Sequence, residues 1–195
     1  DGATFTCQVG DTGPGGGKIF YVAPVTFSCG QTLSSTCKYL EAAPTTGTNA
    51  WTDAQYAWSG NTSVAIGATA QGTAIGTGYA NTLAIIGQSA TAERAGTISR
   101  AYRGPNTLTD WFLPSQNELN QMCKWARGQA WTSDITLCNG TGVLNTGSGA
   151  AGFVEYDYWS SSEANADFAR SQLFFGYQGD GSKLLATYVR PVRAF

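Results

Sequence analysis

The sequence predicts an α+β domain, with strands near both ends of the chain and helices between them. The run KIFYV at 18–22 and the stretch 183–195 alternate aromatic or branched residues with polar ones, as β-strands do. Between them, the segment 115–127 carries a complete signal for the start of a helix. At 195 residues with 42% apolar content, the chain suits a single domain, 1–195, with a substantial core.

The first strand follows a turn rich in glycine. Pro14 fixes one backbone angle and the glycines at 15–17 are free to take positive φ, so the segment turns and leads into the strand. It lacks the Gly-x-x-x-x-Gly-Lys-Ser/Thr spacing of a phosphate-binding loop, and no helical pattern follows it. A second strand is expected at 37–44, where Pro44 ends it.

Three aromatic residues lie in the irregular stretch 45–63 that follows. Trp51, Tyr56 and Trp58 could form an exposed platform for a sugar ring, since ring faces stack on the apolar faces of sugars, or they could anchor a long loop to the core. We favour core packing.

Two helices are predicted in the middle of the chain. The first spans 81–94, with Asn81 available as its cap. The second spans 115–127, because Ser115 can cap it and Glu118, three residues later, completes a capping box.

The last third of the chain predicts three strands separated by turns. These are YDYWSSS at 156–162, ADFARSQLFFGY at 166–177 and KLLATYVRPVRAF at 183–195. The Asp-Gly pair at 180–181 indicates a hairpin between two of these runs. A glycine-rich loop, 129–157, precedes them.

Five cysteines allow two internal disulfides and leave one residue over. Local spacing favours Cys29 with Cys37, which closes a small loop. It also favours Cys123 with Cys138, which ties the second helix to the loop after it. Cys7 is then left over, to pair with upstream chain, with another subunit or with nothing. Reduced, buried cysteines are the alternative. Disulfides would place the chain outside the cytoplasm.

Charge and hydropathy exclude several classes of partner. Only 12% of the residues are charged, the net charge is −2, and the eleven Lys and Arg residues are scattered singly, so nucleic acid is not an expected partner. No apolar stretch of membrane-spanning length occurs. Because the chain opens at Asp1 without Met or a signal peptide, we expect a fragment of a longer secreted protein.

The residues offer little for catalysis. The chain has no histidine, which removes the usual general base and most transition-metal sites. Two carboxylate pairs, Glu155 with Asp157 and Glu163 with Asp167, are interpreted as solvated charges rather than an acid–base pair. The serines at 160–162 lack a base and are expected to form hydrogen bonds at a strand end. We therefore expect no enzyme and no cofactor.

Four motifs occur in order along the chain, with GTAIGTGYANTLAII (72–86) between the first and the second. They are DTGPGGGKIFYV (11–22), DWFLPSQNEL (110–119), YWSSSE (158–163) and YVRPVRAF (188–195). Together they resemble the bacterial domain family named after the C-terminal domain of a collagen-like adhesin. The resemblance runs from about residue 10 to 195 and implies a C-type-lectin-like fold. That fold has two helices flanking small antiparallel sheets, long glycine-rich loops, and paired N- and C-terminal strands, so that KIFYV would lie beside YVRPV.

The resemblance also implies a function. It suggests a non-catalytic, extracellular fibre tip for cell adhesion that binds a glycan (carbohydrate binding) or another cell-surface receptor. It further implies a homotrimer, with residues 1–9 as the connector to an upstream stalk. The alternatives are a structural trimer cap without ligand binding and, more remotely, an oxidase or hydrolase on a lectin-like fold. The calcium motifs of true C-type lectins do not occur, so calcium is expected at most as a structural ion.

Ligand contacts are expected outside the four motifs, in about 129–157 and 164–183. In similar lectin-fold proteins diversified for recognition, the variable positions lie between the YWSSSE-like strand and the terminal strand. An ordinary polar strand is the alternative. The corresponding candidates are Asp167, Arg170, Gln172, Phe174, Tyr177, Gln178, Asp180 and Lys183. Alternation along a strand would put Asp167 or Phe168 on one face with Arg170, Gln172 and Phe174.

Two arginines of the terminal motif complete the predictions. Arg190 and Arg193 are expected to bond loop carbonyls and carboxylates, with Asp110 or Glu163 as partners, rather than to bind an external anion.

Overall fold

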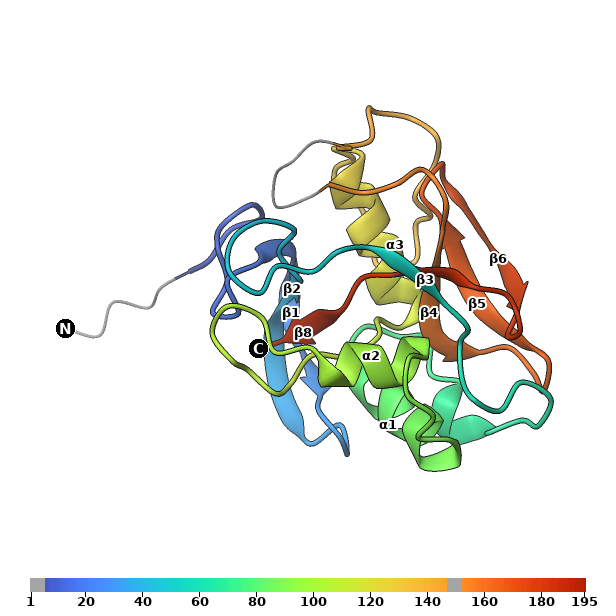
Figure 1. Cartoon of the computed structure of the whole chain (residues 1–195). Helices are drawn as coiled ribbons and strands as arrows, with labels where there is room; N and C mark the ends of the chain where they lie inside the picture. The colour runs from blue at the N-terminus through green and yellow to red at the C-terminus, as the bar shows by residue number, and fades with distance from the viewer. Residues whose placement is uncertain (1–5, 147–151) are drawn as a thin grey trace.

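A computed structural model describes residues 6–146 and 152–195. It confirms an α+β fold, with two small sheets and the helices arranged beside them (Figure 1). The smaller sheet has the order β1-β2-β8, and its strands are β1 (Lys18–Cys29), β2 (Ser35–Ala42) and β8 (Val192–Ala194). The larger sheet has the order β3-β7-β4-β5-β6, and its strands are β3 (Ala54–Tyr56), β4 (Asp157–Glu163), β5 (Phe168–Leu173), β6 (Tyr177–Ser182) and β7 (Thr187–Val189).

The two ends of the sequence share the smaller sheet but do not pair directly, which corrects one prediction. Strand β2 lies between them: Leu40 is opposite Tyr21 on one side and Ala194 on the other. The main chain of Phe195 continues this pairing by accepting the N–H groups of Lys38 and Tyr39. The strand at 37–44 therefore forms the centre of the sheet, because it bonds on both edges.

Three α-helices occur in the described residues, where two were predicted. They are α1 (Gly78–Gln88), α2 (Ala95–Ala101) and α3 (Gln116–Ala126), and a short 3-10 turn covers Ala68–Ala70. The predicted helix at 81–94 starts earlier and ends earlier than expected, and Asn81 does not cap it. Instead the Asn81 amide lies within α1 and donates to the carbonyl of Gly72 at 2.6 Å.

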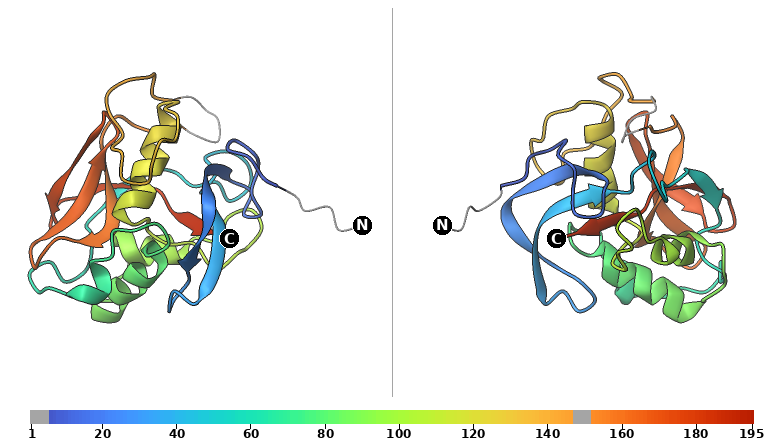
Figure 2. Two further views of the ribbon diagram at one scale, coloured as in Figure 1. Left: turned by 180° about the vertical axis from the view of Figure 1, so that it is seen from behind. Right: turned by 60° about the vertical axis from the view of Figure 1, so that its left-hand side comes forward.

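Helix α3 confirms its predicted start. The Ser115 hydroxyl accepts the N–H of Glu118 at 3.4 Å, and the Glu118 carboxylate accepts the N–H of Ser115 at 2.7 Å, which is the reciprocal capping box. Both side chains are fully buried. Helix α3 packs between the two sheets, so its position determines which strand faces are buried (Figure 2).

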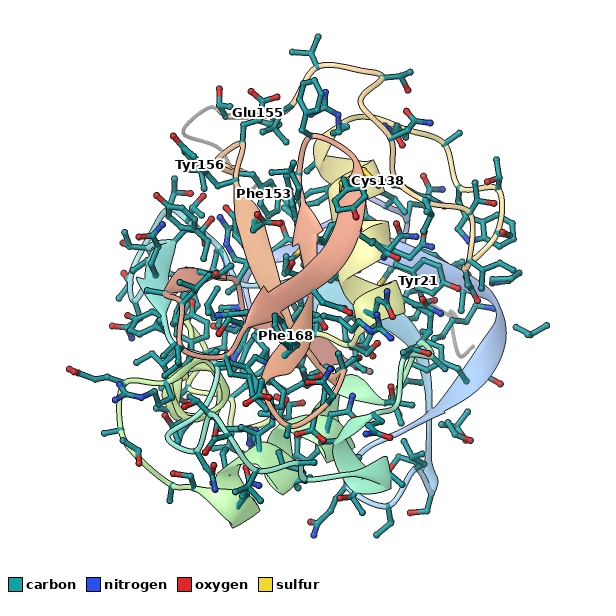
Figure 3. The ribbon with its side chains drawn as sticks, turned by 90° about the vertical axis from the view of Figure 1, so that its right-hand side faces the viewer. Tyr21, Cys138, Phe153, Glu155, Tyr156 and Phe168 are labelled. Carbon is teal, nitrogen blue, oxygen red and sulfur yellow. A yellow bond between two sulfur atoms is a disulfide. The ribbon has the colours of Figure 1, made fainter. Side chains whose placement is uncertain are left out.

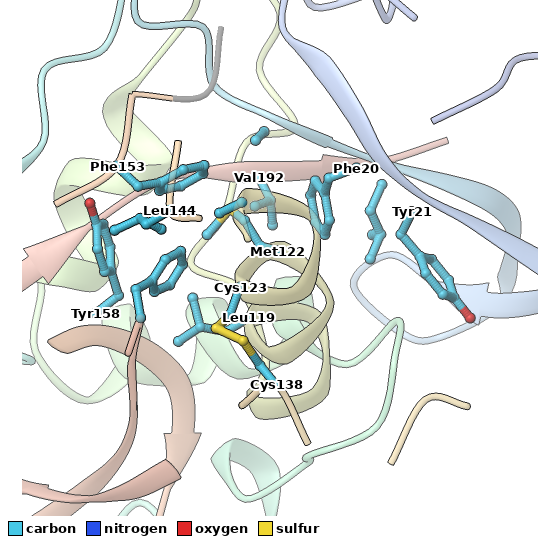
Figure 4. Packing of buried hydrophobic residues seen from close by; sticks show 14 of the residues in the cluster. Phe20, Tyr21, Leu119, Met122, Cys123, Cys138, Leu144, Phe153, Tyr158 and Val192 are labelled. Atoms are coloured by element: carbon cyan, nitrogen blue, oxygen red, sulfur yellow. A yellow bond between two sulfur atoms is a disulfide. The ribbon is translucent and has the colours of Figure 1, made fainter. Parts of the chain in front are cut away.

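Two apolar clusters form the core. One surrounds α3 and holds residues of β1, β4 and the β5–β6 hairpin, among them Phe20, Leu119, Met122, Tyr158 and Phe174 (Figure 4). The other holds the buried tryptophans Trp51, Trp58, Trp111 and Trp159. Core packing of Trp51 and Trp58 is therefore confirmed, and Tyr56 packs against the same cluster while only partly buried.

The hairpin between β5 and β6 turns at a different place from the predicted one. Asp180 and Gly181 lie inside β6, and the chain turns at Phe174–Gly176, where Gly176 has a φ of 109°. Gly181 is needed for packing instead: a Cβ atom there would lie 2.6 Å from the Trp159 ring.

Both predicted disulfides form. Cys29–Cys37 joins the ends of β1 and β2, and Cys123–Cys138 ties α3 to the loop that follows it. Cys7 forms no disulfide.

Residues 1–5 of the expected connector, and 147–151 of the loop 129–157, lie outside the described residues. None of the helices in the described ranges is long and apolar enough to cross a membrane.

Candidate functional site

The glycine-rich first motif is held by an internal carboxylate. Glu41 is fully buried in β2 and accepts the N–H groups of Gly15 at 2.9 Å and Gly17 at 2.6 Å. Arg193 donates to Glu41 at 3.3 Å and to Asp110 at 2.6 Å. Burial tends to lower the pKa of Arg193, but Asp110 and Glu41 outweigh it and raise that pKa. The turn thus directs its N–H groups at the protein's own carboxylate.

The second arginine of the terminal motif binds a different acid. Arg190 donates through two nitrogens to the carboxylate of Asp53, at 2.5 Å each, and lies over the ring of Phe153 at 4.4 Å. The Tyr158 hydroxyl donates to the same carboxylate. Bonding to carboxylates is confirmed for both arginines. Asp110 is a correct partner for Arg193, whereas Glu163 is a partner of neither.

Glu163 instead forms a buried ion pair with Lys183. The two side chains are fully buried and 2.6 Å apart, and the Lys183 ammonium lies 4.8 Å from the centre of the Trp58 ring. Glu163 also accepts the N–H groups of Ile66 and Gly67. Burial alone would raise the pKa of Glu163, but these hydrogen bonds and Lys183 lower it. The prediction that Glu163 is a solvated charge is wrong.

The serines of YWSSSE are hydrogen-bonding residues, as predicted. Ser160 donates to the carbonyl of Arg170 at 2.9 Å. Ser162 donates to the carbonyl of Gly72 at 2.7 Å and accepts the N–H of Gln116 at 3.0 Å, which links β4 to the start of α3. All three serines are buried. The motifs therefore build the internal frame of the protein.

Three of the eight predicted ligand residues are buried, so they present no surface to a ligand. Phe174 is fully buried, with its ring centre 4.4 Å from that of Tyr158. Gln172 donates to the carbonyls of Leu173 and Tyr177, and Lys183 is committed to its internal ion pair. For Gln172 and Phe174 the physical reason is α3, which packs on this face of β5 and encloses its second half. Lys183 is enclosed elsewhere, beside Glu163 and Trp58.

The other five predicted residues reach the surface around the β5–β6 hairpin, whose ribbon faces the viewer in Figure 3. Arg170 and Asp180 form an ion pair at 2.7 Å, with each side chain 40% exposed. Gln178 accepts a hydrogen bond from the side chain of Gln116 at 3.1 Å. Tyr177 is 67% exposed, and Asp167 is also exposed.

A groove of about 330 Å³ lies along this hairpin, and it is the candidate functional site. It is lined by Asp157, Ser171, Leu173, Tyr177, Gly179, Asp180, Gly181, Leu185 and Thr187. In the strand register Ser171 is opposite Gly179 and Leu173 is opposite both Asp157 and Tyr177, so these positions share one face of the sheet. That face is the reverse of the predicted one, which carries Arg170, Gln172 and Phe174.

The groove combines an aromatic ring with a carboxylate. Tyr177 offers an exposed ring face, and Asp157 lies across the sheet from it with Ser171 Oγ 3.5 Å from its carboxylate. Burial raises the pKa of Asp157, and the Ser171 hydroxyl partly offsets this. A ring face beside hydroxyl and carboxylate oxygens can stack on a sugar and hydrogen-bond to its hydroxyl groups.

Sequence reasoning found Tyr177 and Asp180 and missed the other groove residues. Asp157 and Ser171 were detectable as members of adjacent strands, with Asp157 at the start of its strand. The sequence did not show which face of each strand is enclosed and which faces solvent, because that depends on where α3 packs.

In the described parts of the chain, no group of three or more Cys, Asp or Glu residues could hold a metal ion.

Comparison with known proteins gives a likeness in fold. No protein-family model matches the sequence, and no curated protein matches it. Among solved structures, a fimbrial protein from Bacteroides ovatus superposes with a TM-score of 0.56 at 15% sequence identity. The match covers 97% of this chain and 49% of the other, so this chain spans about half the length of that protein. The chain therefore shares the fold of one half of a fimbrial protein.

Proposed function

We propose that this chain is a ligand-recognition module of a bacterial surface fibre, which binds a glycan or another cell-surface ligand. The fold likeness to a fimbrial protein supports a fibre component. The two disulfides support an extracellular location, because such bonds persist in oxidising compartments. The four motifs that resemble an adhesin domain family, with its C-type-lectin-like fold, support the same class of protein.

The groove beside the β5–β6 hairpin is the observation that carries the proposal. Tyr177 is 67% exposed at its wall, and Asp157 supplies carboxylate oxygens on the same face of the sheet. A sugar ring would stack on the tyrosine and donate its hydroxyl protons to the Asp157 carboxylate. The aromatic ring loses little freedom on binding, since it has few rotatable bonds.

A glycan array tests this proposal directly. The purified protein is applied in calcium and again in chelator, and the strongest ligand is titrated against variants. Tyr177→Ala should weaken binding about tenfold, as expected when a stacked ring is removed. Tyr156→Ala is the matched control, because Tyr156 is similarly exposed, at 63%, and does not line the groove. A blank array in both conditions, or equal losses in the two variants, would overturn the proposal.

We also propose that the module is non-catalytic and needs no cofactor. Among the internal groups that could act as acids or nucleophiles, Glu163 is held by Lys183, and the hydroxyls of Ser160 and Ser162 are bonded to the main chain. The chain has no histidine to activate them. If binding persists in chelator, calcium has no part in recognition; if it is lost, calcium has a role.

A structural cap for a trimeric fibre is the second candidate, and exposed apolar side chains favour it. Phe175, Leu184 and Leu185 are 57%, 73% and 60% exposed close to the same hairpin. In a homotrimer, another copy would cover them and thereby remove apolar surface from water. A blank array together with a trimer that dissociates on Leu184→Lys would favour the cap.

A further inference from the structure

A second pocket lies on the other side of α3, outside the groove. It has a volume of about 400 Å³, and its walls come from β1, the last turns of α3 and the loop that follows. The lining residues are Val9, Phe20, Tyr21, Val22, Gln121, Lys124, Trp125, Gly128, Gln129, Ala130 and Trp131. Figure 4 shows Phe20 and Tyr21 beside the helix, with the Tyr21 ring directed away from the cluster.

Trp131 is exposed but held in place. Its side chain is 48% exposed, and its indole N–H donates to Asp134 Oδ1 at 3.1 Å. The Tyr21 hydroxyl donates to the same oxygen at 2.5 Å, so one carboxylate fixes two rings of the pocket wall. An exposed ring that is already immobilised costs little entropy when a ligand stacks on it. The arrangement is that of a preformed platform.

The loop that carries Trp131 is fixed to α3. The Asn120 amide donates to the carbonyl of Thr136 at 2.9 Å, and the Gln121 amide donates to the carbonyls of Ser133 and Asp134. The Cys123–Cys138 disulfide closes the far end of the loop. On the opposite wall, Trp125 is held by Phe20 and Phe153, with ring centres 6.3 Å and 6.0 Å away. Both tryptophans therefore keep their positions.

Among the described residues that line this pocket, Lys124 is the only charged one. It is 3% exposed, and its ammonium donates to one carbonyl, that of Ser133, at 3.0 Å. An ammonium has three N–H donors, so two are left for a ligand. The nearby Asp134 does not line the pocket, and one of its oxygens is already bonded to Tyr21 and Trp131. A buried donor with spare hydrogens favours a ligand that carries an anionic oxygen.

We propose that this pocket binds a pyranose ring that carries a carboxylate, of the uronic-acid type. The apolar face of the sugar stacks on Trp131, and the sugar carboxylate accepts hydrogen bonds from Lys124. This site is separate from the groove at Tyr177 and does not depend on it. A chain with both sites binds two sugar units of one acidic glycan, or two glycans.

Titration of the whole chain with methyl β-D-glucuronide and methyl β-D-glucoside tests the proposal. The glucuronide should bind about fivefold or more tightly than the glucoside, since only it can use the ammonium. Trp131→Ala should weaken both about tenfold. Lys124→Met keeps the stem volume and should abolish the preference while leaving the glucoside affinity unchanged. Tyr156→Ala is the control, because Tyr156 is 63% exposed and lines neither site, and it should bind both probes as the wild type does.

A measurement on the wild type keeps the test independent of folding defects in the variants. The glucuronide should shift the indole N–H resonance of Trp131 in a saturable way. Absence of saturable binding, an unchanged preference in Lys124→Met, or loss of binding in Tyr156→Ala would each overturn the proposal. Failure of the glycan array at the groove would leave this titration unaffected, so the two sites are judged separately.

Discussion

At the scale of single residues, Lys183 carries a fully buried charge. It neutralises Glu163 at 2.6 Å inside the fold, where neither side chain touches water. Lys183→Met should lower the free energy of unfolding by about 3–5 kcal/mol, because it leaves a buried carboxylate unpaired. Urea denaturation measures this change.

A surface ion pair is the matched control for this experiment. Arg170→Ala breaks the pair with Asp180, whose side chains are 40% exposed, and should change stability by no more than about 1 kcal/mol. The double variant Lys183→Met with Glu163→Gln should recover part of the loss. Equal effects of Lys183→Met and Arg170→Ala would contradict the assignment of a buried pair.

Glu118 should make stability depend on pH. Burial raises its pKa from 4.5 to about 7, and the N–H groups of Ser115 and Gly76 only partly offset this. Between these two values the folded state holds a proton that the unfolded state releases, so the stability that Glu118 contributes is greatest below about pH 4.5 and falls as the pH rises to about 7. The slope from this group is at most about 1.4 kcal/mol per pH unit.

The measurement is urea denaturation at about pH 5 and about pH 7.5, in the wild type and in Glu118→Gln. The variant cannot lose a proton there, so the part of the slope that comes from Glu118 should disappear. It should also be less stable at the lower pH, because one amide oxygen replaces two carboxyl oxygens that accept N–H groups. An identical slope in both proteins would show that Glu118 does not titrate in this range.

At the scale of elements, two glycines of β6 provide a matched pair. A Cβ atom at Gly181 would lie 2.6 Å from the buried Trp159 ring, whereas one at Gly179 would meet the exposed ring of Tyr177 at 2.9 Å, which can move aside. Gly181→Ala should therefore cost about 1–3 kcal/mol of stability, as overpacking does, and Gly179→Ala clearly less. Thermal unfolding of the two variants compares them, and the reverse order would refute this account of the strand.

The elements differ in how far the sequence could predict them. The start of α3 was predictable because Ser115 and Glu118 bond to each other across three residues. The start of α1 was not, because it depends on a distant contact: a Cβ at Gly78 would lie 2.2 Å from the Glu118 carboxylate. The Asp-Gly pair at 180–181 does not form the predicted turn for a similar reason. Gly181 lies inside β6, where a side chain would collide with Trp159.

At the scale of the whole molecule, the position of α3 decides where a ligand can bind. Alternation along β5 predicted two faces correctly, but only packing determines which one is enclosed. Helix α3 buries Gln172 and Phe174, and the groove opens on the face of Ser171. The pocket at Trp131 escaped prediction because its walls come from β1 and from the loop after α3, far apart in sequence.

Assembly is also a property of the whole molecule. We predict a homotrimer in solution, with a molar mass of about three times the 20.5 kDa of one chain in light scattering. Leu184→Lys should shift the mass toward the monomer if Leu184, which is 73% exposed, lies in the contact between copies. A wild-type monomer at all concentrations would contradict the prediction.

The Cys123–Cys138 bond has a consequence for proteolysis. The bond encloses the exposed loop residues Trp131 and Leu137, which are side chains that digestive proteases of the chymotrypsin type recognise. A single cut between the two cysteines leaves both products covalently joined through sulfur. A nicked chain would therefore migrate as one band without reductant and separate into two bands only after reduction.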